Sequence, residues 1–152
     1  MSGIKLFLHT LIILFLFTSC AFDKPIEFKK IRKVKLTSIK DGMVELQGEA
    51  EFYNPNSMAG KIRKIEIDIL MGDKILGHIS LKEKLKVEKN APFYIPLKAK
   101  LRMEDIQQGF LDNLLVIVGA KKLELHFKGK IKVSRWGISE TVPVDYYQEV
   151  RL

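Results

Sequence analysis

The sequence predicts a mainly β protein: one antiparallel β-sandwich of about seven strands with a single inserted α-helix. Three observations support this prediction. From residue 26 onward, apolar residues recur mostly at every second position, which is the pattern of half-buried strands. Turn-forming pairs such as Asp41-Gly42 and Gly72-Asp73 separate these stretches at regular spacing, as in sandwich domains. The period becomes helical only once, between residues 105 and 118.

The first half of the chain contains four of the expected strands. The strand that starts at Ile26 changes phase near Ile31, which predicts a β-bulge there. Residues 44–52 alternate most regularly, and residues 65–69 and 74–79 are expected to form a hairpin. The polar face of the regular strand is acidic, and we expect it to pair with lysines of neighbouring strands. This face consists of Glu45, Gln47, Glu49 and Glu51.

The second half contains the helix and the remaining strands. A short strand is predicted near residues 85–87, and a longer one over 93–101 must place Pro96 at an edge or a bulge because proline has no amide donor. Asp105 and Gln108 have the spacing of a capping box, so we expect the helix to begin there. Two strands joined by a turn at residues 135–137 follow. The alternation predicts that six apolar side chains share one core: Leu46, Phe52, Ile67, Leu97, Leu125 and Ile131.

The N-terminal residues resemble a bacterial lipoprotein signal. Cys20, the only cysteine, follows a basic Lys5, an apolar run over residues 6–17 and two small residues. A secretory apolar core has about 7–15 residues, whereas a membrane span needs about 20. The resemblance implies that Cys20 carries lipid, including acyl chains such as palmitate; an uncleaved anchor and a cleaved signal beside an unmodified cysteine are the alternatives. The expected divisions are residues 1–19 (signal peptide), 20–25 (lipidated tether) and 26–152 (one domain).

The formal net charge of +8 comes mostly from lysine. Nucleic-acid readers favour arginine, and an exported chain does not meet nucleic acid, so we expect no nucleic-acid partner. The lysines either face anionic lipid headgroups or keep the sheet surfaces soluble. A tether this short reaches only about 16–18 Å, which places the domain at the membrane surface. Ala21 after the cysteine favours the outer membrane over the inner membrane of a bacterial cell envelope.

Residues 48–52 leading into Asn54-Pro55-Asn56, together with 65–77 and 91–96, resemble the late embryogenesis abundant type 2 family, also called the WHy domain. The resemblance implies a fibronectin-like or immunoglobulin-like sandwich. It also implies a non-enzymatic role in stress or desiccation protection, through contacts with membranes or other proteins. Two alternatives stay open: a carrier that holds lipid or another hydrophobic ligand between the sheets, and an adaptor in an envelope protein complex.

Two local features allow a structural and a functional interpretation. Asn54, Pro55 and Asn56 either form a turn, in which asparagine side chains bind their own backbone, or contribute to a ligand site. Trp136 lies between Arg135 and Gly137 in the last predicted turn. Its indole either caps the end of the sandwich or contacts a membrane or protein partner.

The sequence offers no arrangement that indicates an enzyme. If Cys20 carries lipid, as the lipoprotein signal predicts, its sulfur is not free to act as a nucleophile. The sequence also has no nucleophile-elbow motif. His78 and His126, the histidines outside the signal, are expected to be solvated or paired across strands, because a zinc site needs further ligands at set spacing. We therefore expect no catalysis, no cofactor and no bound metal.

Overall fold

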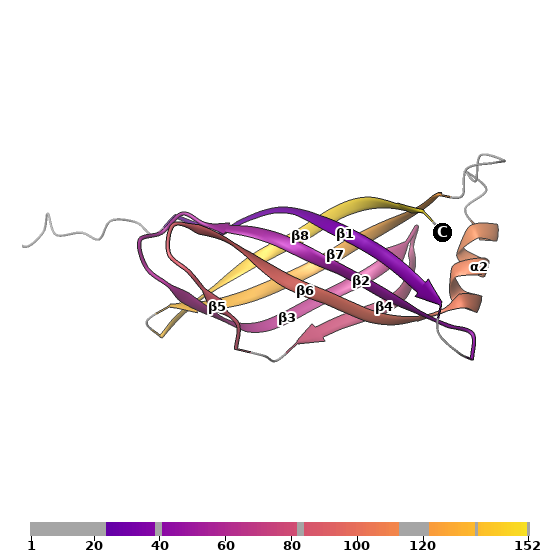
Figure 1. Cartoon of the computed structure of the whole chain (residues 1–152), viewed down its shortest axis with the longest axis horizontal. Helices are drawn as coiled ribbons and strands as arrows, with labels where there is room; N and C mark the ends of the chain where they lie inside the picture. Colours follow the sequence, from indigo (N-terminus) through magenta and orange to yellow (C-terminus); the bar gives the residue numbers. More distant parts are fainter. Residues whose placement is uncertain (1–23, 39–40, 82–83, 113–121, 136, 152) are drawn as a thin grey trace, which may run out of the picture.

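The computed structural model describes residues 24–38, 41–81, 84–112, 122–135 and 137–151. These residues form eight strands and one helix, which Figure 1 shows as an elongated β structure with the helix at one end. The elements are β1 (Glu27–Ser38), β2 (Met43–Asn54), β3 (Gly60–Met71), β4 (Lys74–Leu81), β5 (Lys86–Val87), β6 (Ala91–Arg102), α2 (Met103–Asp112), β7 (Lys122–Arg135) and β8 (Ile138–Arg151).

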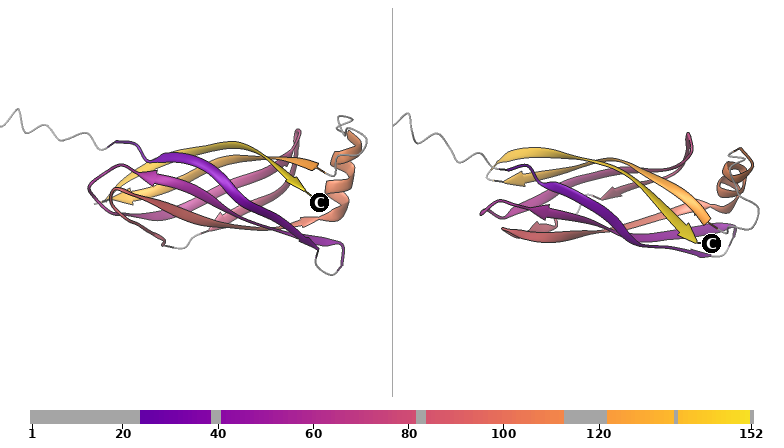
Figure 2. Two further views of the ribbon diagram at one scale, coloured as in Figure 1. Left: turned by 45° about the horizontal axis from the view of Figure 1, so that its top comes forward. Right: turned by 90° about the horizontal axis from the view of Figure 1, so that it is seen from above.

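The strands form two antiparallel sheets in a sandwich-like arrangement. One sheet, sheet A, has the order β1-β2-β6; the other, sheet B, has the order β4-β3-β7-β8, with β5 also paired to β3. The two sheets lie face to face, and their edges approach each other where β1 meets β8 and β4 meets β6 (Figures 1 and 2). The described residues form eight strands, where about seven were expected. The predicted short strand near residues 85–87 is present as β5, which pairs with the start of β3 at Gly60 and Lys61.

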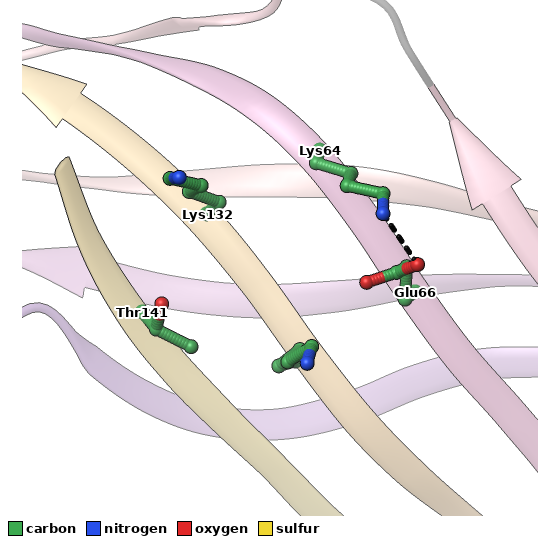
Figure 3. A pocket seen from close by; sticks show the side chains of 5 residues that line it. Lys64, Glu66, Lys132 and Thr141 are labelled. Carbon is green, nitrogen blue, oxygen red and sulfur yellow. Dashed lines mark ion pairs between the residues drawn. The ribbon is translucent and has the colours of Figure 1, made fainter.

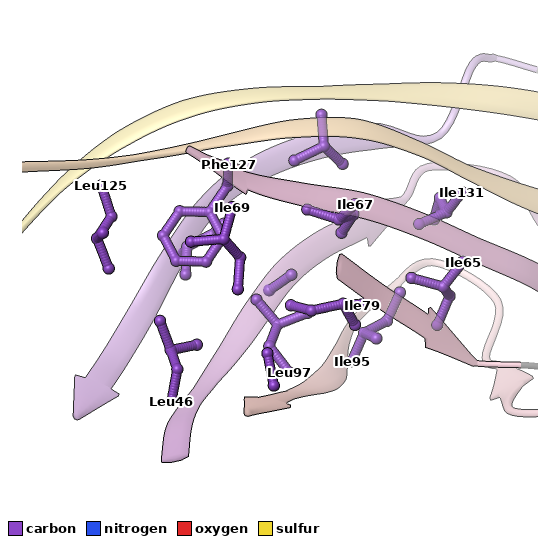
Figure 4. Close-up of a cluster of buried hydrophobic side chains, with 14 of the residues drawn as sticks. Leu46, Ile65, Ile67, Ile69, Ile79, Ile95, Leu97, Leu125, Phe127 and Ile131 are labelled. Carbon is purple, nitrogen blue, oxygen red and sulfur yellow. The ribbon is translucent and has the colours of Figure 1, made fainter. Parts of the chain in front are cut away.

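The core between the sheets is made of the side chains that the alternation predicted. Leu46 and Leu97 come from sheet A, and Ile67 and Ile131 come from sheet B; all are fully buried. Figure 4 shows these side chains pointing into the space between the two layers. The prediction is confirmed for all six positions, each with no exposed surface: Leu46, Phe52, Ile67, Leu97, Leu125 and Ile131.

The predicted turn and bulges of the first hairpin are present. Asp41 and Gly42 both have positive φ angles, 66° and 70°, as the tight turn between β1 and β2 requires. The β1–β2 register shifts on both sides of Ile31, and Lys33 in the second shift has a φ of 55°. Pro96 lies on the edge strand β6 without any register shift against β2, so of the two predicted positions the structure has the edge and not a bulge.

The start of the helix was predicted wrongly. α2 begins at Met103, so Asp105 lies within its first turn and does not cap it with Gln108. The Asp105 carboxylate instead accepts from Arg102 Nε at 2.7 Å and forms an ion pair with Lys74 at 3.1 Å. The predicted end of the helix near residue 118 lies outside the described residues.

Candidate functional site

The Asn54-Pro55-Asn56 segment forms a buried hydrogen-bonded junction at the end of the sandwich opposite α2. Asn54 is fully buried, and its Nδ2 donates to the carbonyl oxygens of Met58 at 2.9 Å and Glu88 at 2.8 Å. Its Oδ1 accepts from the backbone N of Asn56 at 3.1 Å and from Asn56 Nδ2 at 3.0 Å. Both polar atoms of the Asn54 side chain are therefore committed to internal partners. This arrangement favours the turn interpretation over a ligand site.

The same junction holds the N-terminal entry to the domain. Asn56 Nδ2 also donates to the carbonyl oxygen of Lys24 at 2.7 Å. Two residues later, the backbone N of Ile26 donates to Glu140 Oε1 at 2.9 Å, and the other oxygen of Glu140 accepts from Arg135 Nη2 at 2.7 Å. Asn56 and Arg135 are both buried, so contacts to the β2–β3 turn, β7 and β8 fix the point where the chain enters the domain.

Two predicted site residues lie outside the described part of the chain. Cys20 precedes the first described residue, and Trp136 falls between the described residues of β7 and β8. The flanking residues place this last turn at the same end of the molecule as the N-terminal entry (Figure 1). Next to the gap, Arg135 is buried whereas Ile138 is 77% exposed. Among the described helices, none has the length and apolarity to cross a membrane.

A shallow hollow lies on the outer face of sheet B. It has a volume of about 240 Å³ and is lined by side chains from β3, β7 and β8. Figure 3 shows these side chains around an open centre, with Thr141 and Glu66 on opposite sides. The lining residues, which we call the lysine hollow, are Lys64, Glu66, Lys130, Lys132 and Thr141.

Strand register explains why these residues meet. Lys132 of β7 is the direct cross-strand partner of both Lys64 on β3 and Thr141 on β8, while Lys130 is the partner of Glu66. Lys64 Nζ lies 2.6 Å from Glu66 Oε1. That hydrogen bond, with the charges of Lys64, Lys130 and His78, holds the pKa of Glu66 below its ordinary value, so the carboxylate stays ionised at neutral pH.

On the outer face of sheet A, acidic side chains of β2 pair with basic side chains of β1. Arg32 Nε lies 3.2 Å from Glu49, and Lys33 Nζ lies 3.1 Å from the same carboxylate. A hydrogen bond from Lys33, together with the charges of Lys33 and Arg32, holds the pKa of Glu49 below its ordinary value. Arg32 also reaches Glu51 at 3.7 Å and stacks over the ring of Tyr94. The predicted pairing with lysines of a neighbouring strand is thus confirmed for Glu49, with Lys33, and for Glu51, which lies 3.9 Å from Lys30 Nζ.

Both histidines are paired with aspartates on neighbouring strands, as expected. His78 Nδ1 lies 2.7 Å from Asp68 Oδ1, its direct cross-strand partner. His126 Nε2 lies 2.7 Å from Asp145 Oδ1, and the imidazole stacks on the ring of Tyr147 at 4.0 Å between centroids. Within the described residues, no group of three or more histidine, cysteine or acidic side chains could hold a metal ion.

Comparison with known proteins shows the fold alone. Neither a protein-family model nor a curated protein matches the sequence. The chain is similar to the solution structure of AT1g01470 from Arabidopsis thaliana, with a TM-score of 0.63, 11% identity and 89% of each chain covered. It is also similar to a crystal structure of a protein from Archaeoglobus fulgidus, with a TM-score of 0.59, 10% identity, and 83% of this chain and 98% of that chain covered. The X-ray structure of Northeast Structural Genomics Consortium target SoR45 gives a TM-score of 0.51 at 11% identity, covering 87% and 88% of the two chains.

Several of the residues that shape these sites were not predicted. Glu140 and Lys24 were missed because their partners, Ile26 and Asn56, are distant in sequence. The lysines of β7 recur at every second position, which is a visible sign of a charged outer face. The lysine hollow forms only because particular residues of β3 and β8 lie opposite these lysines. The alternation of apolar and polar residues within β7 does not reveal which residues those are.

Proposed function

We propose that the protein is a non-enzymatic, lipid-anchored protein of the bacterial cell envelope that acts by binding at the membrane surface. The fixed N-terminal entry is the observation that supports this proposal most directly. A lipid on Cys20 would be separated from the clamped Lys24 by only three residues, a reach of about 13–14 Å. The hydrogen bonds from Asn56 to Lys24 and from Ile26 to Glu140 then give the domain a defined orientation relative to its anchor.

The role in stress or desiccation protection rests on the resemblance to the late embryogenesis abundant type 2 family. That resemblance implies a two-sheet domain with one helix, and the sandwich-like fold described above agrees with it. The proposed mode of action is contact with the membrane or with other envelope proteins. The N-terminal signal and Ala21 favour the outer membrane as the site of anchoring.

The alternative of a hydrophobic carrier receives less support from the interior of the domain. A carrier needs a cavity of about 300–1,000 Å³ for its ligand. Phe52, Leu97 and Ile95 of sheet A meet Ile67 and Phe127 of sheet B, and each of these side chains has no exposed surface. Buried side chains of both sheets point into the region between the layers (Figure 4), which favours a binding surface on the outside.

The anchor is tested by Cys20→Ser in cells supplied with labelled palmitate. The variant should lose the label and leave the membrane fraction, because serine has no sulfur to carry the diacylglyceryl group. Ser57→Ala, in an exposed loop, is the control and should behave as the wild type. If the Cys20→Ser protein remains in membranes after a high-salt wash, the anchor lies elsewhere. Density-gradient separation of the two membranes tests the assignment to the outer membrane.

A further inference from the structure

The lysine hollow carries a charge imbalance that the described residues do not relieve. Lys64 and Lys132 are direct cross-strand partners, and like charges in such pairs destabilise a sheet. Glu66 neutralises Lys64 through its 2.6 Å ion pair. Among the described residues, no carboxylate lies within ion-pair distance of Lys130 or Lys132, and the one acidic cross-strand neighbour of Lys130 is Glu66, which already holds Lys64. Three lysines and one carboxylate leave two net positive charges around one hollow.

We propose that the lysine hollow is a binding site for a phosphate group. Each ammonium of Lys130 and Lys132 offers three donors, and the hydroxyl of Thr141 adds another from the neighbouring strand. Phosphate oxygens accept several hydrogen bonds at once, and lysine binds phosphate as a point charge. The volume of about 240 Å³ exceeds several times the roughly 30 Å³ of a water molecule, so a hydrated phosphate group fits.

Glu66 sets the side on which the anion binds. Its carboxylate remains ionised and holds Lys64, so it repels an anion from the β3 side of the hollow. Thr141 lies on the opposite side, on β8 (Figure 3). The phosphate group therefore sits toward Lys130, Lys132 and Thr141, and Lys64 contributes through its charge.

The position of the hollow relates it to the membrane. The neighbouring pair Lys61 and Ser134 lies next to the β7–β8 turn, at the end of the domain where the chain enters. Further along the same face, the cross-strand row of Asp68, Lys128 and Asp145 is acidic on balance. Positive charge is thus concentrated in the half of sheet B nearest the anchor. A lipid headgroup phosphate as the ligand rests on the proposed anchoring; a free phosphate ion does not.

The test is chemical footprinting of lysines in the full-length protein. An amine reacts with an acylating reagent only when it is deprotonated, and a bound anion stabilises the ammonium form. The protein is reconstituted into vesicles of a neutral galactolipid, whose headgroup carries no phosphate, with and without millimolar inorganic phosphate, and into galactolipid vesicles that also contain phosphatidylglycerol. Mass spectrometry then gives the acylation rate of each lysine. Lys98 and Lys100, exposed on the outer face of sheet A, are internal controls.

We expect acylation of Lys130 and Lys132 to slow by about fivefold when the anion is present, because the anion stabilises their ammonium forms. Acylation of Lys64, which lies at the edge of the site, should slow by a smaller factor, and that of Lys98 and Lys100 should change less than about twofold. Slowing in phosphatidylglycerol vesicles alone identifies the headgroup as the source, and slowing by inorganic phosphate identifies the free ion. Unchanged rates under both conditions overturn the proposal. Co-flotation of the protein with the vesicles is recorded in the same samples, so a failure of anchoring is seen separately.

Two double variants that remove the same charge test whether the anion protects lysines at the lysine hollow in particular. In Lys130→Gln with Lys132→Gln, the remaining Lys64 should lose its protection by the anion. In Lys98→Gln with Lys100→Gln, which removes the same charge from sheet A, Lys64 should keep that protection. All four positions are exposed, so the fold is preserved in both variants. If Lys64 loses the same protection in both variants, the anion is attracted by the overall positive charge of the protein. That result would overturn the assignment of the site to the lysine hollow.

Discussion

Asn56 Nδ2 donates a 2.7 Å hydrogen bond to the carbonyl oxygen of Lys24, which precedes it by 32 positions. Asn56 is buried, and its backbone oxygen accepts from the backbone N of Asn90 at 2.9 Å. One residue therefore joins the N-terminal entry, the β2–β3 turn and the approach to β6. The predicted turn therefore also holds the N-terminal segment in place where the chain enters the domain.

We predict that Asn54→Asp is destabilising although it preserves the shape of the side chain. The carboxylate cannot donate to the carbonyl oxygens of Met58 and Glu88, so these two acceptors would face a buried negative charge instead of a donor. We expect the free energy of unfolding to fall by at least about 2 kcal/mol, since each orphaned buried group costs about 1–3 kcal/mol. Urea denaturation measures the change. Ser57→Ala is the control, and a loss equal to that of the control would show that the junction adds no stability.

Alanine substitutions at core positions should test whether the predicted face of each strand is the buried one. Ile67→Ala and Leu125→Ala each remove a fully buried side chain, and we expect losses of about 2–5 kcal/mol in the free energy of unfolding. Ile75→Ala is the matched control, because Ile75 is 59% exposed on β4; its loss should stay within about 0.5 kcal/mol. Losses at Ile67 and Leu125 as small as that of the control would contradict the assigned core.

Features encoded within one strand or turn could be predicted from the sequence. The alternation around Ile67 and Leu97 identifies the buried face, because burial on one side of a strand imposes a period of two. The Asp41-Gly42 pair identifies its turn, because both positions take positive φ angles that these residues tolerate. The edge position of Pro96 follows from its missing amide donor.

Features that depend on distant partners could not be predicted in this way. Asp105 has the local spacing of a helix cap with Gln108, but Lys74 from the β3–β4 hairpin lies within 3.1 Å and draws the carboxylate into an ion pair. The lysine hollow requires Lys64 and Thr141 to lie opposite the same residue of β7. Register between strands is set by the packing of the whole domain, so a single strand does not reveal it.

We predict that Gly129→Ala severely destabilises the protein. Gly129 lies opposite Ile67, where β3 and β7 approach closely. An added Cβ would lie 2.1 Å from the Glu66 carbonyl oxygen and 2.7 Å from Ile67 Cα, so the backbone itself would have to move. We expect a loss of more than about 3 kcal/mol. Thermal unfolding followed by circular dichroism measures it.

Gly48→Ala is the control for this substitution. Its added Cβ would lie 3.3 Å from a Val34 methyl carbon, which can adjust, and 3.5 Å from the nearest backbone atom. We expect a much smaller change in the melting temperature than at Gly129. If the two variants melt together, backbone proximity at Gly129 does not limit the fold.

Asp105 should make the attachment of α2 dependent on pH. Hydrogen bonds from Arg102 and then Lys74 hold the pKa of Asp105 below its ordinary value of 3.8. Because the folded-state pKa is lowered, the stabilising contribution is complete above pH 3.8 and is lost as the pH falls through the lowered value. Carbon-detected NMR titration of the carboxyl group measures this pKa directly in the folded protein.

The two partners of Asp105 should differ in their effect on that titration. Arg102→Gln removes the larger cause, the contact with Arg102 Nε at 2.7 Å, and should raise the Asp105 pKa further than Lys74→Gln, which removes the contact at 3.1 Å. Lys98→Gln on the outer face of sheet A is the control for a general loss of positive charge. Removal of both partners should return the pKa toward 3.8. An unchanged pKa in the Arg102→Gln variant would show that the contact with Arg102 does not lower the Asp105 pKa.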